Sequence, residues 1–350
     1  MRPSLPVTDP LLSRLDPRSF GDIARHVLDG PTFEWIRSGS GSEFGGDNEA
    51  AFGRRRLRPR VLVDVSAVRT ATTVLGAPVA APLMVGPMGL QRAVHPDGEL
   101  AMAEGTARAG SLLVVAVNST TSIEDIASTA PDLPLWFQLY NWDDRDALAG
   151  VIARAEAAGC RAIVPLVNTP LGVNHTSPRL GFRLPAGARF AHFETSPGLL
   201  ATNTWEYLAW LRSVTSLPIV PKGIMTGDDA ARAADVGAAG IIVSNHGGRQ
   251  LARSISTLDA LSDVVEGAAG LEVYLDGGVR SGGDILIALA LGARAVLVGR
   301  PVMWGMALGG ADGVARVLDT FREELAEDAG MCGIADVAAV PRDLVVDAAC

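Results

Sequence analysis

Cysteine, aromatic side chains and long apolar runs are all scarce in this chain of 350 residues. The three cysteines, Cys160, Cys332 and Cys350, lie far apart without a CxxC or histidine pairing, which excludes a disulfide scaffold and a zinc site. No apolar run reaches the roughly 18 to 20 residues of a membrane span, and the first residues lack the apolar core of a signal peptide. We therefore expect a cytoplasmic protein without a membrane segment and without a metal.

Positive charge is also in short supply. The chain has 30 Lys and Arg against 39 Asp and Glu, so its formal net charge is -9, and nucleic acid is not an expected partner. The arginine block from position 54 to 60 is better interpreted as a solvated or subunit-contact surface than as a phosphate site. Because 48% of the residues are hydrophobic, the chain can form a large core.

Eight short, mostly apolar runs are typical of strands buried on both faces. They span residues 82–86, 112–116, 135–139, 162–166, 218–222, 240–244, 272–276 and 295–299. Ala-rich amphipathic stretches that end in glycine lie between most of them, at 98–110, 144–159, 226–237 and 282–292. This alternation predicts an α/β protein, a single (β/α)8 TIM barrel over 1–350, rather than an open doubly wound sheet.

Two segments do not fit the repeat. Residues 1–80 precede the first strand and are expected to form an N-terminal helical extension. Residues from about 171 to 204 follow the fourth strand and are rich in Gly, Pro, Asn and Ser. Barrel enzymes build their active sites after the carboxyl ends of strands, which favours a lid-like insertion here over a plain surface loop.

The ends of the last two strands carry glycine and arginine. Strand seven is followed by DGGVRSGG from Asp276, and strand eight is followed by Gly299-Arg300-Pro301. Backbone amides and guanidinium groups at this place in a barrel commonly bind a phosphate. Tight turns alone are the alternative explanation for the glycines.

The end of strand six, SNHGGRQ, places His246 and Arg249 three residues apart on a glycine-rich turn. An imidazole there can move a proton while the guanidinium holds a carboxylate. Strand five ends in Lys222, and the alternation of strand three sends Gln138 and Tyr140 to one side. These groups suit a phosphorylated cofactor that carries out redox chemistry on a small acid.

The strings SNHGGRQL, DGGVRSGGD with GRP, FQLY, PKGI and HPDGE resemble the FMN-dependent 2-hydroxy acid oxidase and dehydrogenase family. That family includes glycolate oxidase, lactate oxidase and mandelate dehydrogenase, as well as hydroxymandelate oxidase relatives. The resemblance runs from about Arg58 to the C-terminus. It implies FMN as cofactor, a small carboxylate substrate, oxygen or another electron acceptor, and a homo-oligomer, often a tetramer.

The resemblance also implies roles for single residues. His246 is expected to abstract a proton, Arg249 to anchor the substrate carboxylate, Tyr140 to bond the substrate oxygen, and Lys222 to stabilise the reduced flavin. The residues implied to contact the cofactor are Met88, Gly89, Gln138, Lys222, Ser244, Asp276, Gly278, Arg280, Gly299 and Arg300.

Three residues depart from the family pattern on the substrate side. Asn168 takes the place of an aspartate behind the histidine, and it is expected to keep the hydrogen bond to His246 while removing the charge. Asn174 takes the place of an arginine, and Trp35 takes the place of a tyrosine. Asn168 is therefore a candidate catalytic residue, and Trp35 and Asn174 are candidate substrate-binding residues for a rebuilt, larger or aromatic substrate.

Three other functions stay open at this point. Asn168 and Asn174 are compatible with an FMN enzyme of altered outcome, such as oxidative decarboxylation or oxidation of an amine or a carrier-bound substrate. A flavin-binding partner protein that has lost catalysis is disfavoured by the presence of His246 and Arg249. A phosphate-sugar enzyme on the same barrel explains the glycine-rich strand ends but leaves the pair on strand six unexplained.

Overall fold

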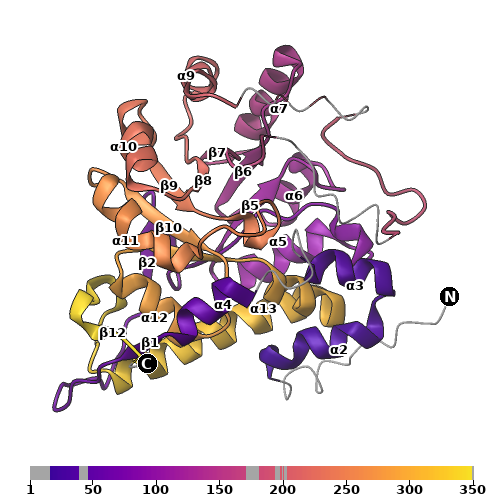
Figure 1. Ribbon diagram of the computed structural model, residues 1–350. Coiled ribbons are helices and arrows are strands. Elements are labelled where there is room, and N and C mark those ends of the chain that lie inside the picture. Colours follow the sequence, from indigo (N-terminus) through magenta and orange to yellow (C-terminus); the bar gives the residue numbers. More distant parts are fainter. Residues whose placement is uncertain are drawn as a thin grey trace.

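A ring of parallel strands surrounded by helices forms the centre of the computed structural model, which describes residues 16–38, 46–170, 181–193, 198, 200 and 203–348 (Figure 1). The eight strands of the ring are β4 (Leu83–Val85), β5 (Leu112–Ala116), β6 (Leu135–Leu139), β7 (Ile163–Pro165), β8 (Lys222–Ile224), β9 (Gly240–Val243), β10 (Glu272–Asp276) and β11 (Ala295–Val298).

The strands pair in the order β7-β6-β5-β4-β11-β10-β9-β8, and every pairing in this sheet is parallel. Two isolated bridges, Ile163 to Ile219 and Leu166 to Lys222, join the two edges and close the ring. The predicted (β/α)8 TIM barrel is therefore confirmed.

The fifth barrel strand differs from its predicted position. The sequence predicts a strand over 218–222 that ends in Lys222, whereas β8 begins at Lys222 and its pairing with β9 shifts register before Ile224. Residues 218–221 still bond to the neighbouring strands, as Val220 N–H does to Ile163 O, but Pro218 and Pro221 have no N–H to donate, so the regular ladder begins only at Lys222.

The interior of the barrel is a packed core that is closed at one end. Inward side chains of the strands, among them Met84, Trp136 and Tyr274, form one buried cluster. A short hairpin of β2 (Thr72–Val74) and β3 (Ala77–Val79) contributes Val74 and Val79 to the same cluster. Because this end is filled by side chains, a ligand site can form only at the opposite end, where the strands end.

The helices cover the outside of the barrel (Figure 1). They are α5 (Glu99–Arg108), α6 (Ile123–Thr129), α7 (Arg145–Ala157), α9 (Trp205–Val214), α10 (Gly227–Asp235), α11 (Thr257–Gly267), α12 (Gly282–Ala290) and α13 (Arg300–Met331). Ser, Thr or Asp side chains cap the first turns of α6, α7, α10, α11 and α12 by accepting a hydrogen bond from a backbone N–H. None of the helices that the structure describes is both long and apolar enough to cross a lipid bilayer.

The N-terminal extension packs on the long C-terminal helix α13. It contains η1 (Pro17–Ser19), α2 (Phe20–Val27), α3 (Gly30–Arg37), α4 (Gly46–Gly53) and β1 (Arg55–Leu57). The ring of Phe33 on α3 stacks on Trp304 of α13 at a centroid distance of 5.0 Å. The extension is thus helical as expected, but β1 and the β2–β3 hairpin add strands to it.

The remaining short elements are η2 (Gln91–Ala93), η3 (His246–Gly248), η4 (Val337–Ala339), η5 (Arg342–Leu344) and β12 (Val345–Asp347). β12 pairs antiparallel with β1, so the C-terminal region meets the N-terminal extension. In the insertion after β7, the described residues 181–193 contain no helix or strand. The prediction of a lid is therefore only partly covered by the described residues.

Candidate active site

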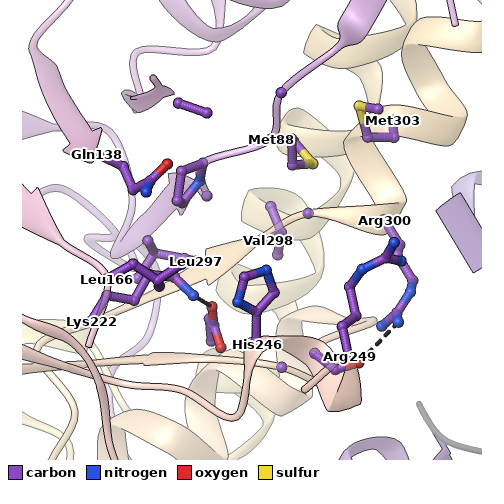
Figure 2. A pocket seen from close by; sticks show the side chains of 18 of the residues that line it. Met88, Gln138, Leu166, Lys222, His246, Arg249, Leu297, Val298, Arg300 and Met303 are labelled. Atoms are coloured by element: carbon purple, nitrogen blue, oxygen red, sulfur yellow. Dashed lines mark hydrogen bonds and ion pairs between the residues drawn. The ribbon is translucent and has the colours of Figure 1, made fainter. Parts of the chain in front are cut away.

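A cavity of about 340 Å³ lies at the carboxyl ends of the barrel strands. The residues labelled in Figure 2 come from segments far apart in the chain, and parallel strands bring them to one edge of the barrel. Of the residues predicted from the sequence, the following line the cavity: Trp35, Met88, Gly89, Gln138, Tyr140, Lys222, His246, Arg249, Asp276, Gly278, Arg280, Gly299 and Arg300.

Three predicted residues are not in this lining. Ser244 is fully buried behind Lys222, whose Nζ donates to its Oγ over 2.7 Å. Asn168 is partly buried behind the same wall. Asn174 lies outside the residues that the structure describes.

The ring of His246 projects into the cavity between Lys222 and the two arginines Arg249 and Arg300 (Figure 2). Its backbone has a φ of 59°, the left-handed region that a side chain rarely adopts, and its N–H donates to Ser244 Oγ over 3.0 Å. Burial lowers the pKa of His246 well below its ordinary value of 6.5, and the three nearby cations lower it further. The imidazole is therefore neutral at neutral pH and can accept a proton.

Asn168 does not make the hydrogen bond that the sequence predicts. Its Nδ2 donates to the backbone oxygen of Ser244 over 2.9 Å, and both Asn168 Oδ1 and His246 Nδ1 are buried without a partner in the described part of the chain. A Cβ placed on Gly223 would come 2.6 Å from Asn168 Cγ, so Asn168 is wedged tightly against this glycine. This packing holds its amide towards Ser244 rather than towards the histidine, and the expectation is wrong.

Lys222 is buried and paired. Its Nζ lies 2.5 Å from Asp276 Oδ2, at the end of β10. Ser244 Oγ accepts from the same Nζ and from the backbone N–H of His246, so one hydroxyl fixes the lysine and the histidine relative to each other. The structure places Ser244 as a support for these two residues rather than at the cavity surface.

Arg249 and Arg300 are held by the end of helix α3. Arg249 Nη1 donates to the backbone oxygens of Trp35, Ile36 and Ser38 over 2.9, 3.3 and 2.7 Å. Arg300 donates from Nε to Ile36 O and from Nη2 to the backbone oxygen of Gly247. The terminal carbonyls of a helix carry partial negative charge and lack partners within the helix, so they can hold a guanidinium without neutralising it.

Both guanidinium groups are charged although they are partly buried. Burial lowers the pKa of Arg249 and of Arg300 to about 10, and each group still carries its proton at neutral pH. Arg249 and Arg280 lower the pKa of Arg300 further by repulsion. Positive charges that are close together and hydrogen-bonded to neutral carbonyls favour the binding of anions.

The glycine-rich turn after β10 is held by the N-terminal extension. Gly278 has a φ of 89°, and a Cβ there would come 2.4 Å from the backbone oxygen of Asn48 in α4. The Asn48 side chain exchanges two hydrogen bonds of 2.8 Å with Asn245. Arg280 forms an ion pair of 2.7 Å with Glu49. Sequence reasoning missed Asn48 and Glu49, because no local motif marks them.

Tyr140 and Gln138 present polar atoms from the end of β6. Burial raises the pKa of Tyr140 to about 12, although Arg249 opposes this effect, so the phenol stays protonated and can donate a hydrogen bond. The Nε2 atom of Gln138 is buried without a partner in the described part of the chain. A buried donor without a partner is costly, which indicates a ligand acceptor at this point.

An aromatic pair lies at the α3 side of the cavity. The ring of Trp35 stacks on Phe182 at a centroid distance of 4.6 Å and an angle of 16°. Phe182 belongs to the insertion after β7, and sequence reasoning did not single it out. We refer to Trp35 and Phe182 as the aromatic pair.

The cavity fits a planar, phosphorylated cofactor. Gln138 Nε2 and Asp276 Oδ1 are buried polar atoms without partners in the described region, and they need a ligand that both accepts and donates hydrogen bonds. Gly89 leaves its backbone uncovered by a side chain, and no other residue fits there, because a Cβ would come 2.6 Å from Asn118 O. Arg280, Arg300 and the glycine amides of the last two strand ends supply the donors that a phosphate needs.

Comparisons with known proteins agree with this fit. The model of the FMN-dependent dehydrogenase family matches residues 24–347, so the chain belongs to this family. An L-lactate oxidase of Nostoc sp. is 43% identical over 332 residues, which cover 87% of this chain and 91% of the relative. The human 2-hydroxyacid oxidase 1 is 41% identical over 346 residues, which cover 92% of this chain and 94% of the relative.

Solved structures give the same result. A variant of mandelate oxidase with (S)-mandelic acid superposes with a TM-score of 0.89 at 40% identity, and the match covers 95% of this chain and 99% of that one. A second mandelate oxidase structure, with (S)-2-phenylpropionate, gives a TM-score of 0.86 at 41% identity over 93% of this chain and 96% of that one. The protein is thus an FMN-dependent oxidoreductase of the 2-hydroxy acid oxidase type.

Proposed function

We propose that the protein oxidises a 2-hydroxy acid with an aromatic or otherwise bulky substituent to the 2-oxo acid. The observation that carries this proposal is the neutral, partly buried His246 between cationic side chains in a cavity that Trp35 also lines. Bound FMN would supply an acceptor for two electrons. The oxidation removes two hydrogens from the substrate. One of them passes to His246 as a proton, and the other leaves together with the two electrons that the cofactor accepts.

Each remaining side chain has one task in this proposal. Arg249 holds the substrate carboxylate with the donors that helix α3 does not use. Tyr140, protonated and beside Arg249, donates to the substrate oxygen. Lys222 places a positive charge where electron density would increase on the cofactor. Gln138, Met88 and Gly89 would contact the cofactor ring, and Gly278, Arg280, Gly299 and Arg300 would hold its phosphate.

The aromatic pair supports a large substituent on the substrate. Arg249 donates to the backbone oxygen of Trp35, so the carboxylate anchor and the Trp35 ring lie on one side of the cavity. A flat substituent on carbon 2 can stack on this ring at little entropic cost. Two of the solved structures that match this chain are mandelate oxidases in complex with phenyl-substituted acids.

Anaerobic titration of the FMN-loaded protein with lactate, mandelate and phenyllactate tests this proposal. We expect the visible flavin band to bleach in a single turnover, fastest with an aromatic acid, and one equivalent of 2-oxo acid to form. Bleaching by lactate alone would overturn the aromatic preference, and the absence of bleaching with every acid would overturn the oxidation itself.

A second outcome is favoured by one observation. Lys222, Arg249 and Arg300 place positive charge around His246, and the amide of Asn168 donates to Ser244 O. A protonated His246 would therefore lack the carboxylate that stabilises it in the family pattern, which suits an altered outcome such as oxidative decarboxylation. Release of carbon dioxide during turnover, measured with a carboxyl-labelled acid, separates this outcome from simple oxidation.

We also propose a location, an assembly state and an electron acceptor for the protein. The chain acts as one FMN-binding domain in the cytoplasm, assembles as a homotetramer and passes its electrons to oxygen or another acceptor. Val61, Leu62, Val63 and Met331 are large apolar side chains exposed to solvent, which supports a surface that a second copy covers. Light scattering of the purified protein tests the assembly.

A further inference from the structure

The described segment 181–193 of the insertion is fixed to the rest of the molecule at both ends. Near its start, Phe182 stacks on Trp35, which lines the cavity. Near its end, the backbone N–H of Ala191 donates to Ser119 O over 3.0 Å, and the His192 side chain is 5% exposed. The anchor at His192 therefore helps to set where the aromatic pair lies.

The two hydrogen bonds of His192 define one protonation state. The backbone N–H of Ile123 can only donate, and it lies 3.0 Å from His192 Nε2, so this nitrogen is a bare acceptor. His192 Nδ1 lies 2.9 Å from the backbone oxygen of Val117, so this nitrogen carries the hydrogen and donates it. Only the neutral imidazole with its hydrogen on Nδ1 satisfies both partners.

A second proton would break the bond between His192 and Ile123. Protonated Nε2 cannot accept from Ile123, and its hydrogen would point at the N–H of the first residue of α6. The positive charge would also face the N-terminal end of a helix, which repels cations. The ring packs edge-on against Phe137 at 5.2 Å, so water does not solvate the cation on that side.

The charged groups around His192 are mixed. Burial lowers its pKa below the ordinary 6.5, and Arg154 on α7 lowers it further. The hydrogen bond to Val117 O opposes this shift, and so do Glu124 on α6 and Glu99 on α5, but Arg154 and Glu124 are already paired over 2.7 Å. Because the anchored form binds its proton more weakly than the free side chain, the anchor is fully stable above about pH 6.5 and weakens as the pH falls.

The segment to which His192 is hydrogen-bonded is part of the cavity wall. His192 binds the segment from Val117 to Ile123, which includes Asn118, and Asn118 lines the cavity. The backbone of Gly89 lies directly against Asn118. One imidazole thus joins the insertion to the wall that is proposed to face the cofactor.

We propose that His192 is a pH-responsive positioning residue, which fixes segment 181–193 and the aromatic pair while its imidazole is neutral and releases them when it is protonated. The proposal goes beyond the oxidation described above, since the anchor operates whichever acid is the substrate. Release makes the mouth of the cavity more mobile and weakens the contact between Phe182 and Trp35.

Hydrogen exchange of the FMN-loaded protein at pH 5.5 and pH 7.5, corrected for the intrinsic exchange rate, tests this anchor. We expect peptides covering 181–193 and 117–126 to lose protection at least threefold at pH 5.5. His192→Gln keeps a donor and an acceptor but does not titrate, so its protection is expected to be equal at both values. His192→Leu makes neither bond and is expected to be poorly protected at both.

His26→Asn is the matched control, since it removes an exposed histidine on α2 and is expected to keep the pH dependence of the wild type. Equal protection of the wild type at both pH values would overturn the proposal. A wild-type loss of protection that persists in His192→Gln and His192→Leu would also overturn it, because another group would then titrate. Exchange needs no turnover, so failure of the proposed oxidation leaves this test intact.

Discussion

The two sides of the cavity are built in different ways. On the side proposed for the cofactor, the side chains come from the barrel strands and the turns that follow them, and two of the charged ones are paired with carboxylates, Lys222 with Asp276 and Arg280 with Glu49. On the side proposed for the substrate, Trp35 comes from the N-terminal extension and Phe182 from the insertion. The arginine on this side is held by backbone carbonyls rather than by a carboxylate.

This difference shows which parts of the site the barrel itself determines. A strand end has a fixed place in a closed sheet, so the cofactor side is set by the fold. The two aromatic rings of the substrate side come from segments outside the repeat, which can change in sequence without disturbing the barrel. Substrate choice can therefore diverge while the cofactor is retained, which agrees with the departure from the family pattern that the sequence predicts at Trp35.

The largest effect is expected from removing the residue between the two sides. His246→Ala is expected to lower kcat by about 10²- to 10⁴-fold, the range for loss of a general base, while FMN stays bound. Stopped-flow reduction and the visible spectrum measure the two quantities, and His26→Ala serves as the control. Retention of the wild-type rate would remove His246 from the mechanism.

Arg249→Met probes the substrate side alone. The loss of a charge that anchors a carboxylate costs about 2–5 kcal/mol, so kcat/KM is expected to fall by roughly 30-fold or more. The affinity for FMN is expected to change little, which fluorescence titration of the apoprotein measures. A matching loss of FMN affinity would contradict the division between the two sides.

Arg280→Ala probes the cofactor side alone. One charge-assisted hydrogen bond to a phosphate is worth about 1.5–3 kcal/mol, so the Kd for FMN is expected to rise roughly tenfold or more. At saturating FMN, kcat/KM is expected to stay near the wild-type value, because Arg280 lies away from the substrate side. A fall in kcat/KM under saturation would show that the two sides are coupled.

Asn168→Asp has the smallest expected effect and sharpens the comparison. A carboxylate near His246 favours the imidazolium, so it raises the lowered pKa of the histidine. Activity is present above that pKa and is lost as the pH falls through it, so the acid limb of kcat/KM is expected to move up by about one pH unit. Asn168→Ala carries no charge, and its acid limb is expected not to move up.

The repeat of apolar runs predicts the barrel and nearly every strand, because a parallel strand buried on both faces has a distinct composition. The fifth strand is the exception, since its regular pairing with β9 begins only at Lys222, after Pro218 and Pro221. The order of helices and strands follows from the same repeat.

The site is predicted in part. Residues at strand ends, such as His246 and Gln138, can be found because the barrel fixes where they meet. Asn48, Phe182 and the carbonyls that hold Arg249 could not be found, since they come from distant segments whose docking leaves no local pattern. The bond of Asn168 depends on packing against Gly223, a contact that spacing does not reveal.

The hold of helix α3 on Arg249 and Arg300 has a consequence for how the protein matures. The carbonyls come from residues 35–38, whereas the guanidinium groups come from positions 249 and 300. Helix α3 has only eight residues, and a helix of this length is marginally stable by itself, so it can hold these groups only after positions 249 and 300 have been synthesised and folded. The positions of both guanidinium groups are thus set only after most of the chain has left the ribosome.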